Sequence, residues 1–454
     1  MRDLGIAFVI LLILGIGATT PFVLTLGYLW TDIFSPQWLS ISLFVGSPIS
    51  ALMGAMAIGG YLLLDRRSPP RPTATLLLSV LFVGWMTLTT TWAVVPDTAW
   101  IQWNWATKTI LFSAFVPFVI RSRVQIEAFL QVFAFSAAGH LLPWGLKTLV
   151  DGGGYNRPLG LLGVNSGPFG ESSMVAGTII MLVPLLLVLR RHSLLIASPT
   201  LRNVLYLGYI VIGLAGAVGT FARTAIVGAA VLLSGFWLQS RRKILFVIAA
   251  VPVAAVLSLA LTTQWQDRIS TIEDPTADTS ADTRLIIWRW TLDYVAQHPF
   301  GGGFDVHNTS QIFVPQPDQE APRLEVGRAP HSIYFQILGE HGWVGLFLFL
   351  AIQAASLGML WKTSRKTRGI VELRWCRDMA KALMMATLTM LACGAFIGIA
   401  YQPTLWNLTA LSVCVSEYAR RYWAQVRADR HLLPFRLSSA VGSGRLARSD
   451  GPSG

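Results

Sequence analysis

Residues 171–190 read ESSMVAGTIIMLVPLLLVLR, an apolar run that ends on a basic residue. A helix of about 20 residues crosses the ~30 Å hydrocarbon core of a bilayer. Lipid cannot hydrogen-bond an open backbone, so an apolar run of this length is expected to be helical even where it contains glycine or proline. Runs of similar character recur through the chain, and they predict its architecture.

The composition agrees with a membrane protein. The 454 residues are 53% hydrophobic and only 13% charged, whereas a soluble domain carries about 25% charged residues. We predict an all-α polytopic membrane protein with about 12–13 transmembrane helices and one large periplasmic loop. The predicted helices span residues 3–18, 20–34, 41–64, 74–93, 105–121, 124–149, 171–190, 203–219, 222–239, 244–262, 332–361, 379–399 and 404–421.

The net charge of +12 reports topology rather than a nucleic-acid partner. Most lysines and arginines fall in alternate gaps between the predicted helices. The positive-inside rule makes those gaps cytoplasmic, and the other gaps, including 263–330, then face outward. The basic residues of these gaps are Arg66, Arg67, Arg71, Arg121, Arg123, Arg190, Arg191, Arg202, Arg241, Arg242, Lys243, Lys362, Arg365, Lys366, Arg368, Arg374, Arg377 and Lys381, followed by the arginines of the tail.

The predicted organisation has four parts: N-terminal helices (1–262), a periplasmic loop (263–330) with a short amphipathic helix (284–297), C-terminal helices (331–421) and a disordered cytoplasmic tail (422–454). Thirteen helices and a cytoplasmic C-terminus would put the N-terminus outside. If the first run is only half-inserted, or forms a short hairpin with the second, the count becomes twelve.

The stretch Thr263–Pro330 is too polar to cross a bilayer. Asp282 and Thr283 can cap a helix that runs from Arg284 to about Gln297. The apolar face of that helix is predicted from residues at 3–4 spacing, Leu285, Trp288, Leu292 and Val295.

Arg284 falls in the first turn of this predicted helix, where the helix dipole disfavours a cation. A salt bridge to Asp282 or Asp278 is one explanation, and an anion ligand is the other. Arg289 lies five residues further on and is expected to point elsewhere, in a structural or supporting role.

Arg223 begins another helix on the outward side. An unpartnered arginine at membrane depth costs at least ~2.5 kcal/mol, so it either reaches the interface or binds an anion. The other outward arginines favour the anion.

His331 follows Pro330 at the start of a long helix, because proline suits the first helical position. Its unperturbed pKa of about 6.5 leaves the imidazole largely neutral and able to accept a proton, and nearby arginines would lower that pKa. The alternative is a packed, structural histidine. Glu340 lies further along the same helix and is a supporting candidate.

Residues 298–303, HPFGGG, are typical of a turn that ends a helix. A phosphate-binding P-loop is excluded because no G-K-[ST] follows. The histidine spacings match no zinc signature, and the three cysteines predict neither a disulfide framework nor a thiolate metal site.

Three segments resemble the O-antigen ligase / O-antigen polymerase superfamily: RLIIW (284–288), HPFGGG (298–303) and HSIYFQILGEHGWVG (331–345). Together with MRDL (1–4) and Arg157-Pro158 they look most like its exosortase A-associated branch of O-glycosylation ligases. The resemblance covers roughly residues 1–425. One departure is at GESS (170–173), where that branch is expected to have Asp and Asn.

The resemblance implies a metal-independent transferase of the bacterial inner membrane that needs no cofactor. The donor would be a glycan linked to undecaprenyl diphosphate, and the acceptor a hydroxyl of a glycan, lipid or protein on the periplasmic face. His331 would be the catalytic base, Arg223 and Arg284 would bind the diphosphate, and Glu340, Arg157 and Arg289 would support them.

Two alternatives stay open. A polymerase of the same superfamily would join glycan units to one another, and these motifs do not separate it from a ligase. A glycolipid transporter would need no catalysis. It should place ionisable residues near the bilayer midplane, whereas here the polar residues gather on one face.

Overall fold

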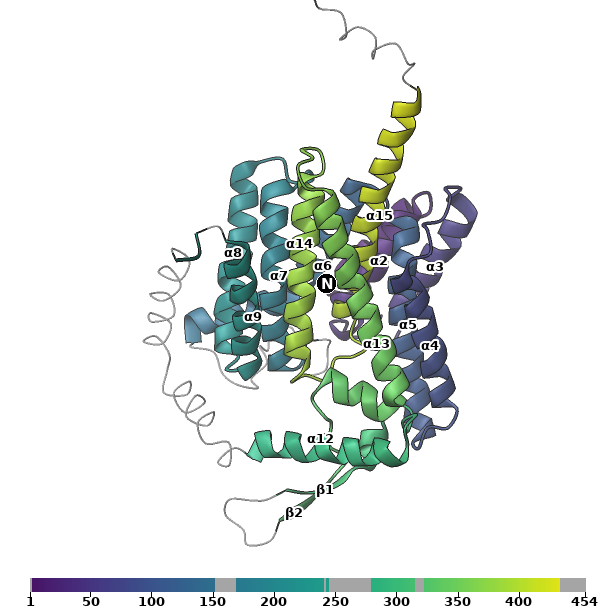
Figure 1. Cartoon of the computed structure of the whole chain (residues 1–454), viewed down its shortest axis with the longest axis vertical. Coiled ribbons are helices and arrows are strands. Elements are labelled where there is room, and N and C mark those ends of the chain that lie inside the picture. The colour runs from purple at the N-terminus through teal and green to yellow at the C-terminus, as the bar shows by residue number, and fades with distance from the viewer. Residues whose placement is uncertain (1, 152–168, 241, 245–278, 315–321, 433–454) are drawn as a thin grey trace, which may run out of the picture.

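The computed structural model describes residues 2–151, 169–240, 242–244, 279–314 and 322–432. Its helices are α1 (Arg2–Gly17), α2 (Pro21–Ile33), α3 (Ile49–Leu64), α4 (Ala74–Thr90), α5 (Pro96–Val119), α6 (Arg123–Asp151), α7 (Ser172–His192), α8 (Pro199–Gly219), α9 (Arg223–Gln239), α12 (Thr279–Gln297), α13 (Ile333–Lys366), α14 (Arg374–Gly394) and α15 (Pro403–Leu432). Most form one bundle, and α12 lies across one of its ends (Figure 1).

The predicted all-α membrane architecture is confirmed. Within the described ranges, α6, α7, α8 and α13 are long and apolar enough to cross a bilayer, and α3, α4 and α9 are shorter apolar helices. Of the predicted segment 244–262, only Ile244 lies within the described residues. The last helix continues to Leu432, so residues 422–432 are helical where the sequence predicted a disordered tail.

The basic gaps meet at one end of the bundle, as their alternation predicted. A guanidinium nitrogen of Arg67 donates to the carbonyl oxygen of Val119 over 3.3 Å, and one of Arg123 donates to that of His192 over 2.7 Å. Across the next gap, Nε2 of His192 lies 2.9 Å from Oδ2 of Asp378. We call this the basic end.

The first two helices form a short antiparallel hairpin. Gly17 lies against Leu24, and Gly27 lies against Ile13 and Met53. At 16 and 13 residues, each helix is shorter than the ~20 residues that a full span needs. This supports the hairpin alternative for the N-terminus.

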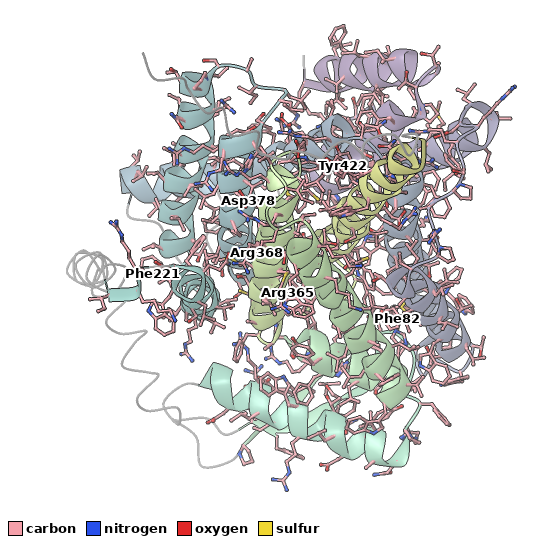
Figure 2. The ribbon with its side chains drawn as sticks, turned by 45° about the horizontal axis from the view of Figure 1, so that its top comes forward. Phe82, Phe221, Arg365, Arg368, Asp378 and Tyr422 are labelled. Carbon is pink, nitrogen blue, oxygen red and sulfur yellow. The ribbon has the colours of Figure 1, made fainter. Side chains whose placement is uncertain are left out.

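The core is aromatic where α4, α13 and α15 meet. Phe82 of α4, which Figure 2 labels, stacks on Trp406 of α15 with 6.0 Å between ring centroids. Phe349 and His341 of α13 pack on the Phe82 ring, with centroid distances of 6.4 and 6.1 Å. These contacts hold the first half of α13, the helix that follows the candidate base His331, against two other helices.

A small sheet that the sequence did not predict lies beneath α12 (Figure 1). Strand β1 (Gln311–Val314) pairs antiparallel with β2 (Arg323–Val326), with Gln311 opposite Val326. Ile312 and Val314 of β1 are buried with Ile287 of α12, and Trp288 packs on this cluster. The sheet therefore supports α12 from outside.

The predicted register of α12 was wrong in two respects. The helix begins at Thr279, so Asp282 lies in its first turn rather than capping it, and Arg284 lies in the second turn. Val295 is buried as predicted and Trp288 is partly buried, but Leu285 and Leu292 are exposed, and Ile287 and Thr291 are buried instead. Both sets repeat with helical spacing, and contact with β1 decides between them.

Candidate functional site

Trp288 of α12 fixes the backbone immediately before His331. Its indole Nε1 donates to the carbonyl oxygen of Pro330 over 2.8 Å. The same ring stacks on Phe335 of α13, with centroids 4.8 Å apart and planes only 4° from parallel. Because Arg284 is one helical turn before Trp288, it lies on the same side of α12. α12 thus joins the two predicted site residues.

The backbone of His331 is in the left-handed region, with φ of 45°. Non-glycine residues rarely adopt this conformation, which costs on the order of 1–3 kcal/mol and recurs at functional sites. The flanking contacts hold it: Pro330 accepts the Trp288 bond, and the carbonyl oxygen of Ser332 accepts from the Gln336 amide over 2.8 Å. The imidazole is thereby held at the mouth of α13, with about 45% of its side chain exposed.

The structure adds a residue that the sequence did not single out for a role, Glu171. Its Oε1 lies 3.7 Å from Nδ1 of His331. Glu171 occupies the position before α7, yet its side chain makes no capping hydrogen bond. The carboxylate is therefore available to orient the imidazole and to stabilise the imidazolium that forms when the ring takes a proton. Its only signal in the sequence was the departure at residues 170–173.

Electrostatics at this point favour a neutral imidazole. Burial lowers the pKa of His331 below its ordinary value of 6.5, and the positive charges of Arg284 and Arg328 lower it further. Burial raises the pKa of Glu171, and the charge of Arg284 opposes that rise. Arg284 is therefore close enough to act on both partners. A neutral, half-exposed imidazole beside a carboxylate is suited to accept a proton.

Arg328 has a carboxylate partner of its own. Its Nε lies 2.6 Å from Oε2 of Glu325 on β2, and its amide donates to Oγ of Ser310. Arg284 is half-buried, and its charge acts on the titration of both Glu171 and His331. Of these two cations, Arg284 is the better placed to meet an anionic ligand.

Arg223 lies at the same end of the bundle, at the start of α9. The residue after it, Thr224, has its carbonyl oxygen 3.8 Å from Sγ of Cys393 on α14. The next α14 residue, Gly394, lies against Ile333, two positions after His331. Just before Arg223, Phe221 has φ of 51°, a second left-handed non-glycine residue. Contacts through α14 therefore connect the start of α9 to the start of α13.

Residues 298–303 form a turn, as predicted, and two amides of this turn donate hydrogen bonds to backbone carbonyl oxygens of α13. The amides of Gly302 and Gly303 donate to the carbonyl oxygens of Gly339 and Glu340 over 3.0 and 2.8 Å. Those carbonyls are free because α13 breaks at Gly342, where φ is 65° and ψ is −167°. A Cβ at Gly342 would lie 2.2 Å from the carbonyl oxygen of Pro299. The turn at residues 298–303 and the break in α13 at Gly342 therefore pack closely against each other.

Glu340 is buried next to the site but does not contact His331 in any described interaction. Its Oε2 accepts from the Tyr401 hydroxyl over 2.5 Å, and its Oε1 accepts from the Asp305 amide over 3.3 Å. These residues and Gln336 line a small cavity of about 160 Å³. Gly398 also lines this cavity, and a Cβ added there would lie 3.9 Å from Cα of His331, so the cavity adjoins the site.

The other predicted candidates are not brought to His331. Arg289 is exposed, and it lies about 140° around α12 from Arg284. Arg157 is outside the described residues. His298 stacks on Tyr294, with centroids 4.5 Å apart. His307 is buried against Thr291, and burial lowers its pKa to about 4, which fits a structural imidazole.

Residues 208–350 match the O-antigen ligase family. This match supports the superfamily that the motifs resembled, and with it a ligase- or polymerase-type function on glycans in a membrane. It does not single out the exosortase A-associated branch. Residues 1–194 match a family of unknown function (DUF5935), and no curated protein matches the chain.

The O-antigen ligase match contains Arg223, Arg284, His331 and Glu340, whereas Glu171 lies in the DUF5935 match. The contact between Glu171 and His331 therefore joins the two matched regions.

Proposed function

We propose that this chain is a glycosyltransferase that moves a glycan from undecaprenyl diphosphate to an acceptor hydroxyl. Transfer would occur at the end of the bundle that carries His331, facing the periplasm of a bacterial inner membrane. The observation that carries the proposal is the imidazole of His331, 3.7 Å from the Glu171 carboxylate, with its pKa lowered by burial and by the charge of Arg284. His331 and Arg284 both lie in the region that matches the O-antigen ligase family.

The reaction needs a base and a leaving-group stabiliser. The acceptor oxygen forms a bond to the anomeric carbon of the donor sugar, and the bond from that carbon to the phosphate oxygen breaks. The acceptor proton passes to His331, and Glu171 stabilises the resulting imidazolium. The electron pair of the broken bond leaves with undecaprenyl diphosphate.

Arg284 and Arg223 would stabilise the departing diphosphate. A guanidinium is permanently charged and can hold two phosphate oxygens at once. Negative charge on the bridging oxygen grows as the bond breaks, so a fixed cation there stabilises the transition state more than the bound donor. The half-buried position of Arg284 strengthens this effect, because water screens it less.

The proposal is tested with full-length protein reconstituted with a lipid-linked glycan donor and an acceptor glycolipid. We expect product in the wild type, and a large loss in Arg284→Gln and in Arg223→Gln. Arg289→Gln is the matched control, since it removes an exposed arginine from the same helix. Movement of the donor lipid without a new glycosidic bond would instead identify a transporter.

The same assay separates ligase from polymerase. A ligase adds one preassembled glycan to each acceptor, so its product has a single added length. A polymerase of the same superfamily would give a ladder of lengths from the lipid-linked unit alone, without the acceptor.

A further inference from the structure

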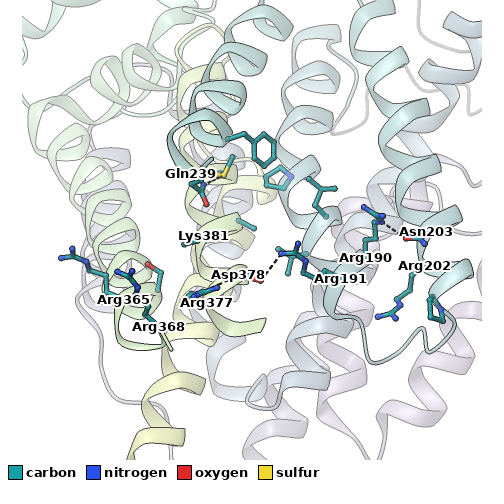
Figure 3. Close-up of a pocket in the computed structure, with 18 residues that line it drawn as sticks. Arg190, Arg191, Arg202, Asn203, Gln239, Arg365, Arg368, Arg377, Asp378 and Lys381 are labelled. Atoms are coloured by element: carbon teal, nitrogen blue, oxygen red, sulfur yellow. Dashed lines mark hydrogen bonds and ion pairs between the residues drawn. The ribbon is translucent and has the colours of Figure 1, made fainter. Parts of the chain in front are cut away.

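A large pocket lies at the basic end of the bundle (Figure 3). It contains Arg365 from the last turn of α13, whereas His331 precedes the first residue of that helix. It has a volume of about 1220 Å³ and is formed by α7, α8, α9, α13 and α14. One part of its wall carries Arg190 and Arg191 from the end of α7, and Arg202 from the start of α8. The facing part carries four more cations, Arg365, Arg368, Arg377 and Lys381.

The seven cations share one carboxylate, that of Asp378. Asp378 already has two cationic neighbours, Arg191 at 3.7 Å and Arg377 at 3.5 Å, and Nε2 of His192 lies 2.9 Å from its Oδ2. Arg365 in the last turn of α13, and Arg368 just after that helix, lie on the other side of Asp378 from Arg191 (Figure 3). One carboxylate cannot neutralise this set, so the pocket has a strong positive potential.

Local backbone features point to an anion as well. α14 begins at Arg374 without an acidic residue in its first turn, and Leu373 provides no side-chain cap. A helix N-terminus with this composition attracts anions. Nearby, Nε of Arg202 is buried and has no hydrogen-bond partner among the described residues. Both features lie in or beside the wall of the pocket.

The pocket is also amphipathic, which favours a lipid over a soluble anion. Its apolar part includes Leu187, Val188, Phe236 and Met385. The guanidinium of Arg365 lies 4.7 Å from the ring centroid of the exposed Trp361. Lys243 lies 4.8 Å from that of Trp237, next to Phe236. Exposed tryptophans are typical of the lipid headgroup region of a membrane, and here each one has a cation against its ring.

We propose that this pocket binds an anionic phospholipid, with its phosphate among the arginines and the upper acyl chains on the apolar part. Basic pockets between membrane helices hold anionic headgroups in this way. The site is separate from the His331 site and does not depend on the proposed glycan transfer. A lipid here would join α7, α13 and α14, the helices that position Glu171 and His331 at the other end.

The test measures the melting temperature of the full-length protein in detergent with phosphatidylglycerol, with phosphatidylcholine and with inorganic phosphate. The pocket variant is Arg365→Gln with Arg368→Gln. The control variant is Arg66→Gln with Arg242→Gln, which removes two exposed arginines from the same end outside this pocket. All variants are first checked by size-exclusion chromatography.

Phosphatidylglycerol should raise the melting temperature of the wild type and of the control variant. The pocket variant should bind it roughly thirtyfold more weakly, since each cation near an anionic lipid strengthens binding about fivefold. An equal effect of phosphatidylcholine, or of inorganic phosphate, overturns the assignment to an anionic lipid. An equal loss in both variants overturns the pocket.

If the pocket variant does not fold, native mass spectrometry of the wild type decides. Preferential retention of phosphatidylglycerol over phosphatidylcholine from an equimolar mixture supports the proposal. Equal retention of the two lipids overturns it.

Discussion

Nδ1 of His331 lies 3.7 Å from Oε1 of Glu171, although His331 lies just before α13 and Glu171 just before α7. The charge of Arg284 on α12 acts on both. Three segments far apart in the sequence therefore supply a base, a carboxylate and a cation at one point on the end of the bundle. Each of these roles can be tested separately.

Glu171 should act as a positioning residue. Glu171→Gln keeps the size of the side chain but removes its charge, so the transfer rate should fall about tenfold or more with little change in the KM for the donor. Glu171→Asp should restore part of the rate. Asp97→Asn, an exposed carboxylate at the start of α5, is the control. A Gln variant with an unchanged kcat would reduce Glu171 to a structural residue.

Arg284 should shift the pH profile as well as the rate. Its positive charge lowers the pKa of His331. A base acts only when deprotonated, so wild-type activity should fall as the pH drops through this lowered value, below 6.5. Arg284→Gln removes the charge and raises the pKa, which moves the acidic limb to higher pH. In Arg289→Gln, activity should fall at the same acidic pH as in the wild type. If Arg284→Gln also loses activity at that unchanged pH, the charge of Arg284 does not act on His331.

Much of the architecture could be predicted because hydropathy and charge act locally. The length of an apolar run and the basic gaps between runs determine which segments are helical and which loops share an end. A helix was predicted to start near His331, and α13 begins at Ile333, but Pro330 is three residues before that start and so does not take the predicted first helical position. These signals lie within a few residues of one another in the sequence.

The features that the sequence missed all depend on tertiary contact. The sequence around Glu171 contains no pattern that indicates a contact with His331. The buried face of α12 depends on β1, because Leu285 and Ile287 both continue a helical period. The break in α13 depends on the fit of Gly301 and Gly302 against Gly339–Gly342. Spacing within one segment cannot reveal a partner from another.

The close packing of the turn at residues 298–303 against Gly342 predicts that alanine substitutions at two glycines of α13 differ strongly in their effect on stability. Gly342 has a positive φ and no room for a Cβ, so Gly342→Ala should destabilise the fold by about 2–4 kcal/mol. Gly358 lies in the same helix, and a Cβ added there would have no atom within 4 Å, so Gly358→Ala should be neutral or stabilising by up to ~1 kcal/mol. Thermal unfolding of both variants in the same detergent measures the two effects. Equal effects would contradict the close packing at Gly342.

The sidedness of the site is a further prediction. The basic end should be cytoplasmic and the His331 end periplasmic. A reporter that is active only in the cytoplasm should be silent when fused near Pro317 and active when fused at Gly369, in the exposed turn after α13. The reverse pattern would place the site on the wrong side of the membrane for a periplasmic transferase.

The most direct test of the account is single-turnover transfer from a lipid-linked glycan by His331→Ala and by His298→Ala. The first variant removes the predicted base, and the second removes an exposed histidine from the neighbouring turn. His331→Ala should lose about 10²–10⁴-fold in rate while still binding the donor, since the arginines are intact. His298→Ala should match the wild type. Full-rate transfer by a folded His331→Ala protein would contradict the central claim.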